Sequence, residues 1–255
     1  MARPLIVIPA RIGATRLPRK PLAEIAGEPM IVHVWRNAMR AEAGDVVVAT
    51  DSIDIAMAVE KAGGRPVMTL SDHPSGSDRV FEAANIVDPD GNSDLIVNVQ
   101  GDQPVLDPSL IRDCLAPLAD PAVDIASVAA LLTDPAAVTE PSIVKLIGTP
   151  TGNAGILRAL YFTRAPAPFG PGPLYQHIGI YAYRREALAQ FVKLPPSPLE
   201  QRERLEQLRA LEAGMRIDVK RVASVPMSVD TPEDLEKVRA YFVAARGPAH
   251  LAAAS

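Results

Sequence analysis

Short runs of consecutive apolar residues alternate with amphipathic segments along the first half of the chain. The apolar runs are rich in Val and Ile and are bounded by turn residues, a pattern that predicts strands at 5–10, 45–50, 65–69 and 95–100. The amphipathic segments predict helices that begin near Pro29, after Ser52, after Ser75-Gly76 and at Asp107-Pro108. Strand–helix alternation of this kind predicts a mostly parallel sheet with helices on both faces.

The pattern changes after about residue 120. Further strands are predicted at 124–132, 142–147, 156–162 and 177–184, without full helices between them, and helices return at 197–213 and after Thr231. We expect one α/β domain over residues 1–245. Within it, residues 124–184 are expected to form a mixed or antiparallel extension suited to a subunit interface and to the binding of a substrate, and residues 246–255 a frayed tail.

Charge and composition narrow the range of partners. The chain has 255 residues with 26 basic and 30 acidic side chains, a net charge of -4, which argues against nucleic acid or an anionic membrane as the main partner. Cys114 is the only cysteine, so the sequence excludes an internal disulfide and a cysteine-based zinc site. No apolar run approaches the roughly 18 residues that span a bilayer, and we expect a soluble, cytoplasmic protein.

A cluster of basic residues follows the first predicted strand. Arg11, Arg16, Arg19 and Lys20 stand close together in VIPARIGATRLPRKPL, with Gly13 as the only glycine. Ligands of open parallel sheets bind at the carboxyl ends of the strands. The stretch matches neither the three-glycine dinucleotide fingerprint nor the Walker loop. It therefore predicts a loop that holds several phosphates with its side chains, although a solvated basic loop has the same composition.

Two acidic residues follow other apolar runs. Asp102 comes after the predicted strand 95–100, and Asp230 comes after VPMSV. Thr231, Pro232 and Asp234 already supply a helix cap, which leaves Asp230 for another role. Two carboxylates at strand ends suit Mg²⁺ shared with substrate phosphates, whereas a single strand-end Asp more often caps a turn.

Eight strings along nearly the whole chain resemble the family of 3-deoxy-manno-octulosonate (Kdo) cytidylyltransferases, in the same order. They are PARIGATRLPRKPL, VVVATDSIDI, HPSGSDR, VNVQGDQP, ALYFTRAP, HIGIYAYR, PSPLEQRERLEQLR and SVDTPEDLEKVR. The resemblance implies a Rossmann-like nucleotidyltransferase fold, a homodimer and a magnesium-dependent reaction of CTP with a sugar acid. The products of that reaction are the CMP-sugar, used for lipopolysaccharide or capsule, and pyrophosphate.

The resemblance also implies roles for individual residues. Lys20, Arg16, Asp102 and Asp230 would form the catalytic set, with Asp102 and Asp230 as ligands of Mg²⁺. The nucleotide would contact Arg11, Arg16, Lys20, Gly76, Arg79, Gln100 and Asp102. The sugar would contact Gln100, Arg164, His177, Tyr181, Glu206 and Gln207. From the residues alone, each of these sugar-side positions is more often a packing or solvated position.

Three departures from the family pattern concern the substrate and the loops. Arg19 replaces the usual glycine, Gln103 replaces the common Glu of QGDEP, and the Pro- and Gly-rich loop 165–174 is short.

The alternatives to a Kdo cytidylyltransferase are the same reaction on an 8-amino-octulosonate or a nonulosonic acid, a glycosyltransferase, and a non-catalytic nucleotide-binding protein. A glycosyltransferase would usually carry an Asp-x-Asp at a strand end, and the literal one, Asp88–Asp90, falls in a predicted loop.

Overall fold

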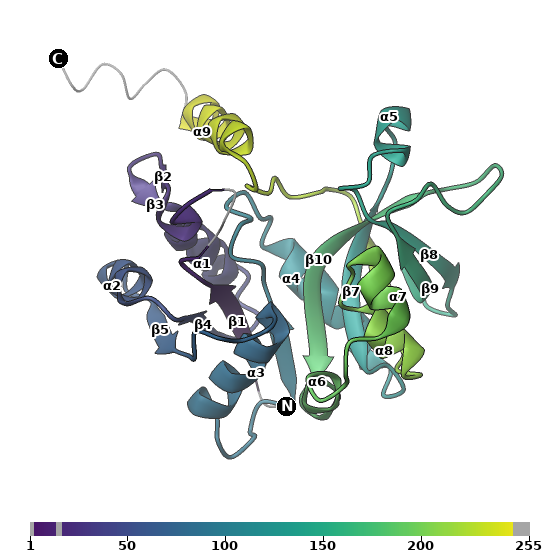
Figure 1. Cartoon of the computed structure of the whole chain (residues 1–255), viewed down its shortest axis with the longest axis horizontal. Helices are drawn as coiled ribbons and strands as arrows, with labels where there is room; N and C mark the ends of the chain where they lie inside the picture. The colour runs from purple at the N-terminus through teal and green to yellow at the C-terminus, as the bar shows by residue number, and fades with distance from the viewer. Residues whose placement is uncertain (1–2, 14–16, 247–255) are drawn as a thin grey trace.

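The computed structural model describes residues 3–13 and 17–246 (Figure 1). Within these residues, nine strands form one mixed sheet in the order β5-β4-β1-β6-β10-β7-β11-β9-β8. The strands are β1 Leu5–Ala10, β4 Asp45–Thr50, β5 Arg65–Met68, β6 Leu95–Asn98, β7 Ile125–Leu131, β8 Lys145–Pro150, β9 Ile156–Thr163, β10 Tyr175–Arg184 and β11 Ile217–Val222.

The first four strands of the sheet, β5, β4, β1 and β6, are parallel, as predicted. Beyond β6 the sheet is mixed, because β10 runs antiparallel to β6 and to β7, whereas β11 runs parallel to β7. A small hairpin of β2 (Glu24–Ile25) and β3 (Glu28–Pro29) lies outside this sheet.

Residues 124–184 are more central than expected. They supply β10 and β7, which lie in the middle of the sheet, as well as β9 and β8 at its edge. The reason is visible in the run IASVAAL of β7, where six consecutive residues are buried, as is typical of a strand covered on both faces. The segment is therefore part of the domain core and not only an extension from it.

The helices match the predicted starts in the first half and differ in the second. Residues 197–213 form two short helices, because Arg204 adopts a left-handed backbone conformation with φ of 55° that ends the first of them. The helices are α1 Met30–Arg40, α2 Ile53–Lys61, α3 Gly76–Val87, α4 Ser109–Leu115, α5 Pro135–Val138, α6 Arg185–Phe191, α7 Pro198–Glu203, α8 Leu208–Glu212 and α9 Pro232–Arg246, with 3₁₀ turns η1 Lys20–Leu22 and η2 Ala116–Ala119.

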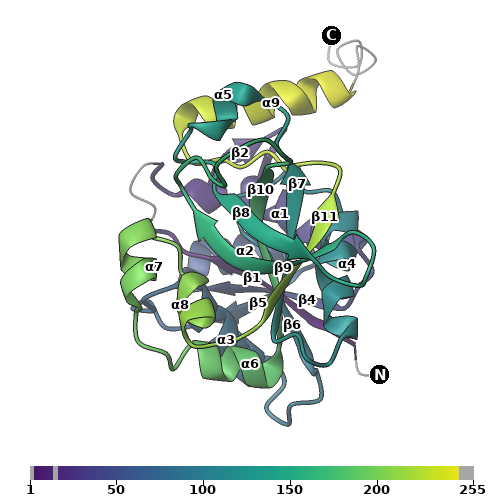
Figure 2. The same ribbon diagram turned by 90° about the vertical axis from the view of Figure 1, so that its right-hand side faces the viewer.

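Helices cover both faces of the sheet, as predicted. Along β1, Leu5 and Val7 pack in one apolar cluster with α3, α6 and α8, whereas Ile6 and Ile8 pack in the other with α1, α2 and α4. Successive residues of a strand point to opposite faces, which is why one strand serves both clusters. Figure 2 shows α6, α7 and α8 together on one side of the sheet and α4 on the other.

Cys114 and His33 are packing residues, in agreement with their apolar sequence surroundings. Cys114 is fully buried under the sheet, and burial raises the pKa of its thiol far above the usual range. His33 lies 2.8 Å from the carbonyl oxygen of Ile25 through Nε2, and its ring packs edge-on against Phe242. Neither residue lines the cavities described below.

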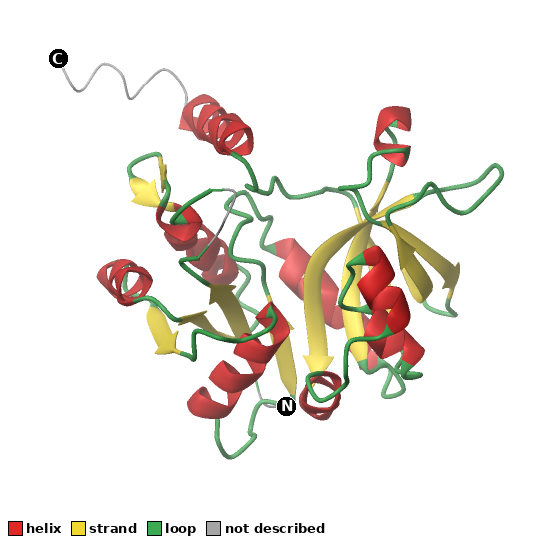
Figure 3. Cartoon of the chain, viewed as in Figure 1, coloured by secondary structure: helices red, strands yellow, loops and turns green. Residues whose placement is uncertain are grey.

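A long loop leads from β11 to α9 and passes the end of the sheet where the site forms. Residues 223–231 leave β11 and cross to α9, which packs over the β2–β3 hairpin (Figure 3). The backbone N–H of Val229 donates to the carbonyl oxygen of Asp102 at 2.9 Å and ties this loop to the one after β6. In the described part of the chain, no helix is long and apolar enough to span a membrane.

Candidate active site

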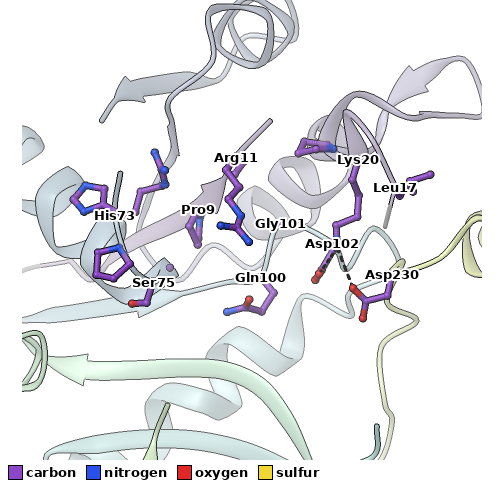
Figure 4. Close-up of a pocket in the computed structure, with 15 residues that line it drawn as sticks. Pro9, Arg11, Leu17, Lys20, His73, Ser75, Gln100, Gly101, Asp102 and Asp230 are labelled. Atoms are coloured by element: carbon purple, nitrogen blue, oxygen red, sulfur yellow. Dashed lines mark hydrogen bonds and ion pairs between the residues drawn. The ribbon is translucent and has the colours of Figure 1, made fainter. Parts of the chain in front are cut away.

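A cavity of about 350 Å³ opens at the carboxyl ends of β1 and β6 (Figure 4). Its walls come from the loops after these two strands, the start of α3 and the loop before α9. The lining residues are Pro9, Ala10, Arg11, Leu17, Lys20, Pro21, His73, Pro74, Ser75, Gly76, Arg79, Gln100, Gly101, Asp102 and Asp230. We call this the first cavity.

Glycine at position 101 allows the two strand ends to approach each other. A Cβ at Gly101 would lie 2.8 Å from the carbonyl oxygen of Pro9, closer than side-chain carbons come to a backbone oxygen. The residues on either side, Gln100 and Asp102, therefore lie beside the end of β1.

Lys20 joins the two predicted acids. Its Nζ donates to Asp102 Oδ2 at 2.9 Å, to Asp230 Oδ1 at 3.2 Å and to the carbonyl oxygen of Val229 at 3.0 Å. Burial alone would lower the pKa of Lys20, but the two carboxylates outweigh it and the pKa is raised. The sequence showed no acid near the basic residues in the loop itself; the acids come from segments more than 80 residues away.

Asp230 lies in the loop before α9 and does not follow a strand, contrary to the prediction. Residues 225–229 form no strand. The Val229–Asp102 hydrogen bond instead brings this loop to the carboxyl end of β6. The predicted cap is present: Thr231 Oγ1 accepts from the N–H of Asp234, and the Asp234 carboxylate accepts from the N–H of Thr231.

The donor set of Asp102 and Asp230 fits Mg²⁺. Oxygens of both carboxylates converge on one cationic group, the Lys20 ammonium, so they can face a single cation. Mg²⁺ is usually bound by one or two carboxylates together with waters and substrate phosphates. Within residues 3–13 and 17–246, no group of three or more His, Cys, Asp or Glu side chains is placed to form a metal site from protein alone.

Four other predicted nucleotide residues, Arg11, Gly76, Arg79 and Gln100, also line the first cavity. Arg11 and Gln100 lie in the middle of the cavity wall. Lys20 and its two carboxylate partners are on one side of them, and His73 and Ser75 are on the other (Figure 4). Gly76 is the first residue of α3, whose cap is Ser75: the Ser75 hydroxyl accepts from two backbone N–H groups at the helix start. Gly76 itself is exposed, and a helix N-terminus beside basic side chains suits phosphate.

Arg79 contributes to the wall from a buried position. It is only 3% exposed, and its guanidinium donates to Thr69 Oγ1 at 2.5 Å and to Asp51 Oδ2 at 3.3 Å. These bonds hold the start of α3 against the ends of β4 and β5. Arg79 thus reaches the cavity as a fixed wall group.

Arg16 lies outside the described residues, so its predicted contact with the nucleotide stays a prediction. Arg19 is not among the residues that line the cavity; it pairs with Asp54 of α2 at 2.7 Å, and its side chain is 61% exposed. The backbone of Arg19 is left-handed, with φ of 56°. This conformation explains why glycine suits the position in the family pattern.

A second cavity, of about 380 Å³, adjoins the first and shares Gln100 with it. Its walls come from the loops after β6 and before β8, from β10, from the turn between α7 and α8, and from the loop after β11. The lining residues are Gln100, Gln103, Ser142, Val144, Gln176, His177, Ile178, Gly179, Tyr181, Leu205, Glu206, Gln207, Val225, Pro226 and Ser228.

His177 and Tyr181 both line the second cavity from β10. Residues four apart on a strand lie on the same face. Their ring centroids are 5.4 Å apart. The pairing of β10 with β7 is irregular between Ile178 and Tyr181, and Ser127 of β7 fills the irregularity. Its hydroxyl donates to the carbonyl oxygen of Ile180 at 2.8 Å and lies 2.9 Å from His177 Nε2, so it can accept a hydrogen bond from that nitrogen.

Glu206 and Gln207 enter the second cavity from the turn between α7 and α8. The sequence predicted a helix over residues 197–213, whereas α7 ends at Glu203 beside the left-handed Arg204 and leaves Glu206 and Gln207 in a turn. Burial raises the pKa of Glu206, although the hydroxyl of Ser77 donates to its Oε2 at 2.9 Å. Gln207 is 6% exposed.

Arg164 is not among the residues that line either cavity, so its predicted contact with the sugar stays a prediction. Its guanidinium donates to the backbone carbonyl oxygens of Pro141 and Glu203 at 2.9 Å each and to that of Arg204 at 3.4 Å. It therefore ties together two loops that carry walls of the second cavity. No Lys or Arg is among the described residues lining this cavity.

The sequence reasoning did not single out Ser142, Gln176 or Ser228 as wall residues. Ser142 and Gln176 lie outside the eight strings, and Ser228 is the first residue of SVDTPEDLEKVR; only the fold places all three on this wall. The Asp88–Asp90 string is structural: Asp88 accepts from the N–H groups of Asn92 and Ser93 and pairs with Arg185 at 2.9 Å.

The pKa of His177 leads to a prediction about stability. Burial lowers this pKa from its usual 6.5 to about 3. Between these values the unfolded chain binds a proton at this position and the folded protein does not. The free energy of unfolding should therefore fall as the pH falls from 6.5 toward 3, by up to about 1.4 kcal/mol per pH unit.

We expect the His177→Asn variant to lose this part of the acid sensitivity. Urea unfolding between pH 7 and 4, followed by the fluorescence of the single tryptophan, Trp35, measures it. The stability advantage of the wild type over the variant should shrink steadily as the pH falls. Parallel pH profiles would show that His177 is protonated in the folded protein as readily as in the unfolded chain.

The comparisons with known proteins agree with this geometry. A family model described as cytidylyltransferase matches residues 5–217. The chain is 62% identical to a "3-deoxy-manno-octulosonate cytidylyltransferase" of Methylobacterium sp. (strain 4-46), covering 96% of this chain and 99% of the relative. It is 61% identical to a protein of the same name from Azorhizobium caulinodans, covering 92% and 94%.

Solved structures show the same relationship. The chain superposes with a TM-score of 0.87 and 40% identity on a "CMP:2-keto-3-deoxy-manno-octonic acid synthetase complexed with CTP", covering 96% of this chain and 100% of that one. A 4-diphosphocytidyl-2C-methyl-D-erythritol synthase of Anaerococcus prevotii, with a TM-score of 0.63 and 13% identity, shares the fold. The nucleotidyltransferase fold is thus confirmed, and the chain belongs to the cytidylyltransferase family.

Proposed function

We propose that this protein transfers CMP from CTP to the anomeric hydroxyl of Kdo, giving CMP-Kdo and pyrophosphate. The observation that carries the proposal is the pair of adjoining cavities that share Gln100. One cavity has the basic and acidic groups that a metal-bound triphosphate needs, and the other has the amides, hydroxyls and imidazole that a polyhydroxylated sugar needs. Relatives that are 61–62% identical carry the name of this activity.

The arrangement suggests how the residues act. The two substrates would meet at Gln100, where the sugar hydroxyl oxygen attacks the α-phosphorus of CTP in line. A new O–P bond forms, the bond from the α-phosphorus to the bridging oxygen breaks, and the hydroxyl proton is released. Arg11 and Lys20 would hold the triphosphate and neutralise the charge that grows on the departing pyrophosphate.

We propose Mg²⁺ as the cofactor, held by Asp102 and Asp230. When bound, it would supply positive charge to the phosphate oxygens. Lys20 contacts both carboxylates at 2.9 and 3.2 Å, and it would turn from them toward the phosphates when substrates bind. His177 is neutral at physiological pH because of its low pKa, so it would orient the sugar by hydrogen bonding and not by charge.

Pyrophosphate release by the purified protein tests the function. The assay contains Mg²⁺ with CTP or UTP, each with and without Kdo. We expect release that requires Kdo and prefers CTP. Tight CTP binding without release in the presence of Kdo would refute Kdo as the substrate. Release with an 8-amino-octulosonate or a nonulosonic acid in its place would then identify the alternative.

We further propose that the protein is a cytoplasmic homodimer that supplies an activated sugar for lipopolysaccharide or capsule. Large apolar side chains in the 124–184 segment support a subunit contact there: Leu131 is 54% exposed, Leu160 56% and Phe169 fully exposed. Light scattering during size-exclusion chromatography should give twice the chain mass of 27.2 kDa.

A further inference from the structure

Gln103 lies where the loop after β6 passes from the first cavity to the second. Asp102 lines the first cavity, and the next residue along the chain, Gln103, lines the second. The loop is held in this course by two bonds to its backbone: Asn37 Nδ2 donates to the carbonyl oxygen of Pro104 at 3.0 Å, and the N–H of Leu106 donates to that of Gln103 at 3.2 Å. Gln103 is therefore fixed next to the proposed metal ligand Asp102, but it lines the second cavity, where we propose that the sugar binds.

The Gln103 side chain is buried with an unused acceptor. It is 7% exposed, and its Oε1 has no hydrogen-bond partner among the described residues. Buried polar atoms are nearly always paired in folded proteins, and an unpaired one destabilises the fold. A buried amide oxygen on the wall of a substrate cavity thus points to a donor on the ligand.

A second unpaired amide atom restricts the chemistry of that ligand. Gln207 Nε2, from the turn between α7 and α8, is also buried without a partner among the described residues. The second cavity therefore offers an acceptor on one segment and a donor on another. A hydroxyl group satisfies both kinds of partner, whereas a carboxylate cannot donate and an ammonium cannot accept.

We propose that Gln103 contributes to sugar binding by accepting a hydrogen bond from a sugar hydroxyl through Oε1. This rests on the proposed function, because it takes Kdo as the occupant of the second cavity. The family pattern commonly has Glu at this position, and Glu and Gln share a carbonyl-type oxygen at the same distance from the backbone. The sugar hydroxyl then needs only the acceptor oxygen of this side chain, and not the whole amide group.

The test compares Gln103→Met, which keeps the side-chain size without the acceptor, with Gln103→Glu, which keeps the acceptor. For Gln103→Met we expect the KM for Kdo to rise about tenfold, the KM for CTP to stay within about twofold, and the melting temperature to rise. Gln103→Glu should restore the KM for Kdo. Gln190→Met, the same change at an exposed position of α6, should alter none of these quantities.

The combination separates a substrate contact from a structural role. A purely structural Gln103 would make the Met variant less stable and raise both KM values, which would overturn the proposal. An unchanged KM for Kdo in Gln103→Met would overturn it as well. If the wild-type protein itself releases no pyrophosphate with Kdo, the proposed function fails first, and the inference fails with it.

Discussion

Replacement of Asp102 by Asn should lower the kcat of Kdo-dependent pyrophosphate release by roughly 10³-fold. Asp102 lies just beyond the carboxyl end of β6, within hydrogen-bond distance of Lys20. Its carboxylate and that of Asp230 both contact the Lys20 ammonium. Asn keeps the size and one oxygen but removes the negative charge. The protein should stay folded, because the Asp102 backbone contact with Val229 does not involve the side chain.

The matched control is Asp45→Asn. Asp45 begins β4 at the amino end of the strand, far from the cavity, and its exposed side chain pairs only loosely with Arg3 at 3.5 Å. Asp230→Asn combined with Asp102→Asn should cost little more than either change alone, because one cation needs both carboxylates. A kcat of Asp102→Asn within tenfold of the wild type would refute the metal site proposed here.

Replacement of Lys20 by Met should have two effects of opposite sign. The kcat should fall by roughly 10² to 10³-fold, because the charge that offsets the departing pyrophosphate is lost. Binding of Mn²⁺ without nucleotide should become tighter, because the ammonium no longer holds Asp102 and Asp230. Electron paramagnetic resonance of free Mn²⁺ measures the second effect independently of activity.

Arg11→Met is the control for the Lys20 experiment. Arg11 lines the same cavity, so its removal takes away an equal charge, but the two carboxylates bond to Lys20. We expect Arg11→Met to weaken CTP binding and to change Mn²⁺ affinity much less than Lys20→Met does. Equal Mn²⁺ affinities in the two variants would mean that only net charge matters and that Lys20 does not compete with the metal.

Local patterns predicted the first half of the fold well. The strands Leu5–Ala10 and Asp45–Thr50 were predicted to the residue, and the helix after Ser75 begins at Gly76 with Ser75 as its cap. These elements were readable because their signals are local: a continuous Val- and Ile-rich run marks a buried parallel strand, and a cap residue marks a helix start.

The sequence analysis did not predict elements that depend on pairing with distant segments of the chain. β11 (Ile217–Val222) contains Lys220 and Arg221 and lacks a continuous apolar run, so only its pairing between β7 and β9 makes it a strand. The break between α7 and α8 at Arg204 was missed because a left-handed arginine has no sequence signature comparable to glycine. The same break decides where Glu206 and Gln207 lie.

By itself, the sequence determined the α/β alternation, the basic loop at the end of the first strand and the family to which these motifs belong. Only the tertiary structure decided that Lys20 bonds to Asp102 and Asp230, that Arg164 ties two loops together outside the cavities, and that Gln103 lines the second cavity. Periodicity and caps act between near neighbours in the chain. A cavity depends on side chains from segments up to 210 residues apart in the chain. Local sequence patterns do not show which of these segments meet, because the folded backbone brings them together.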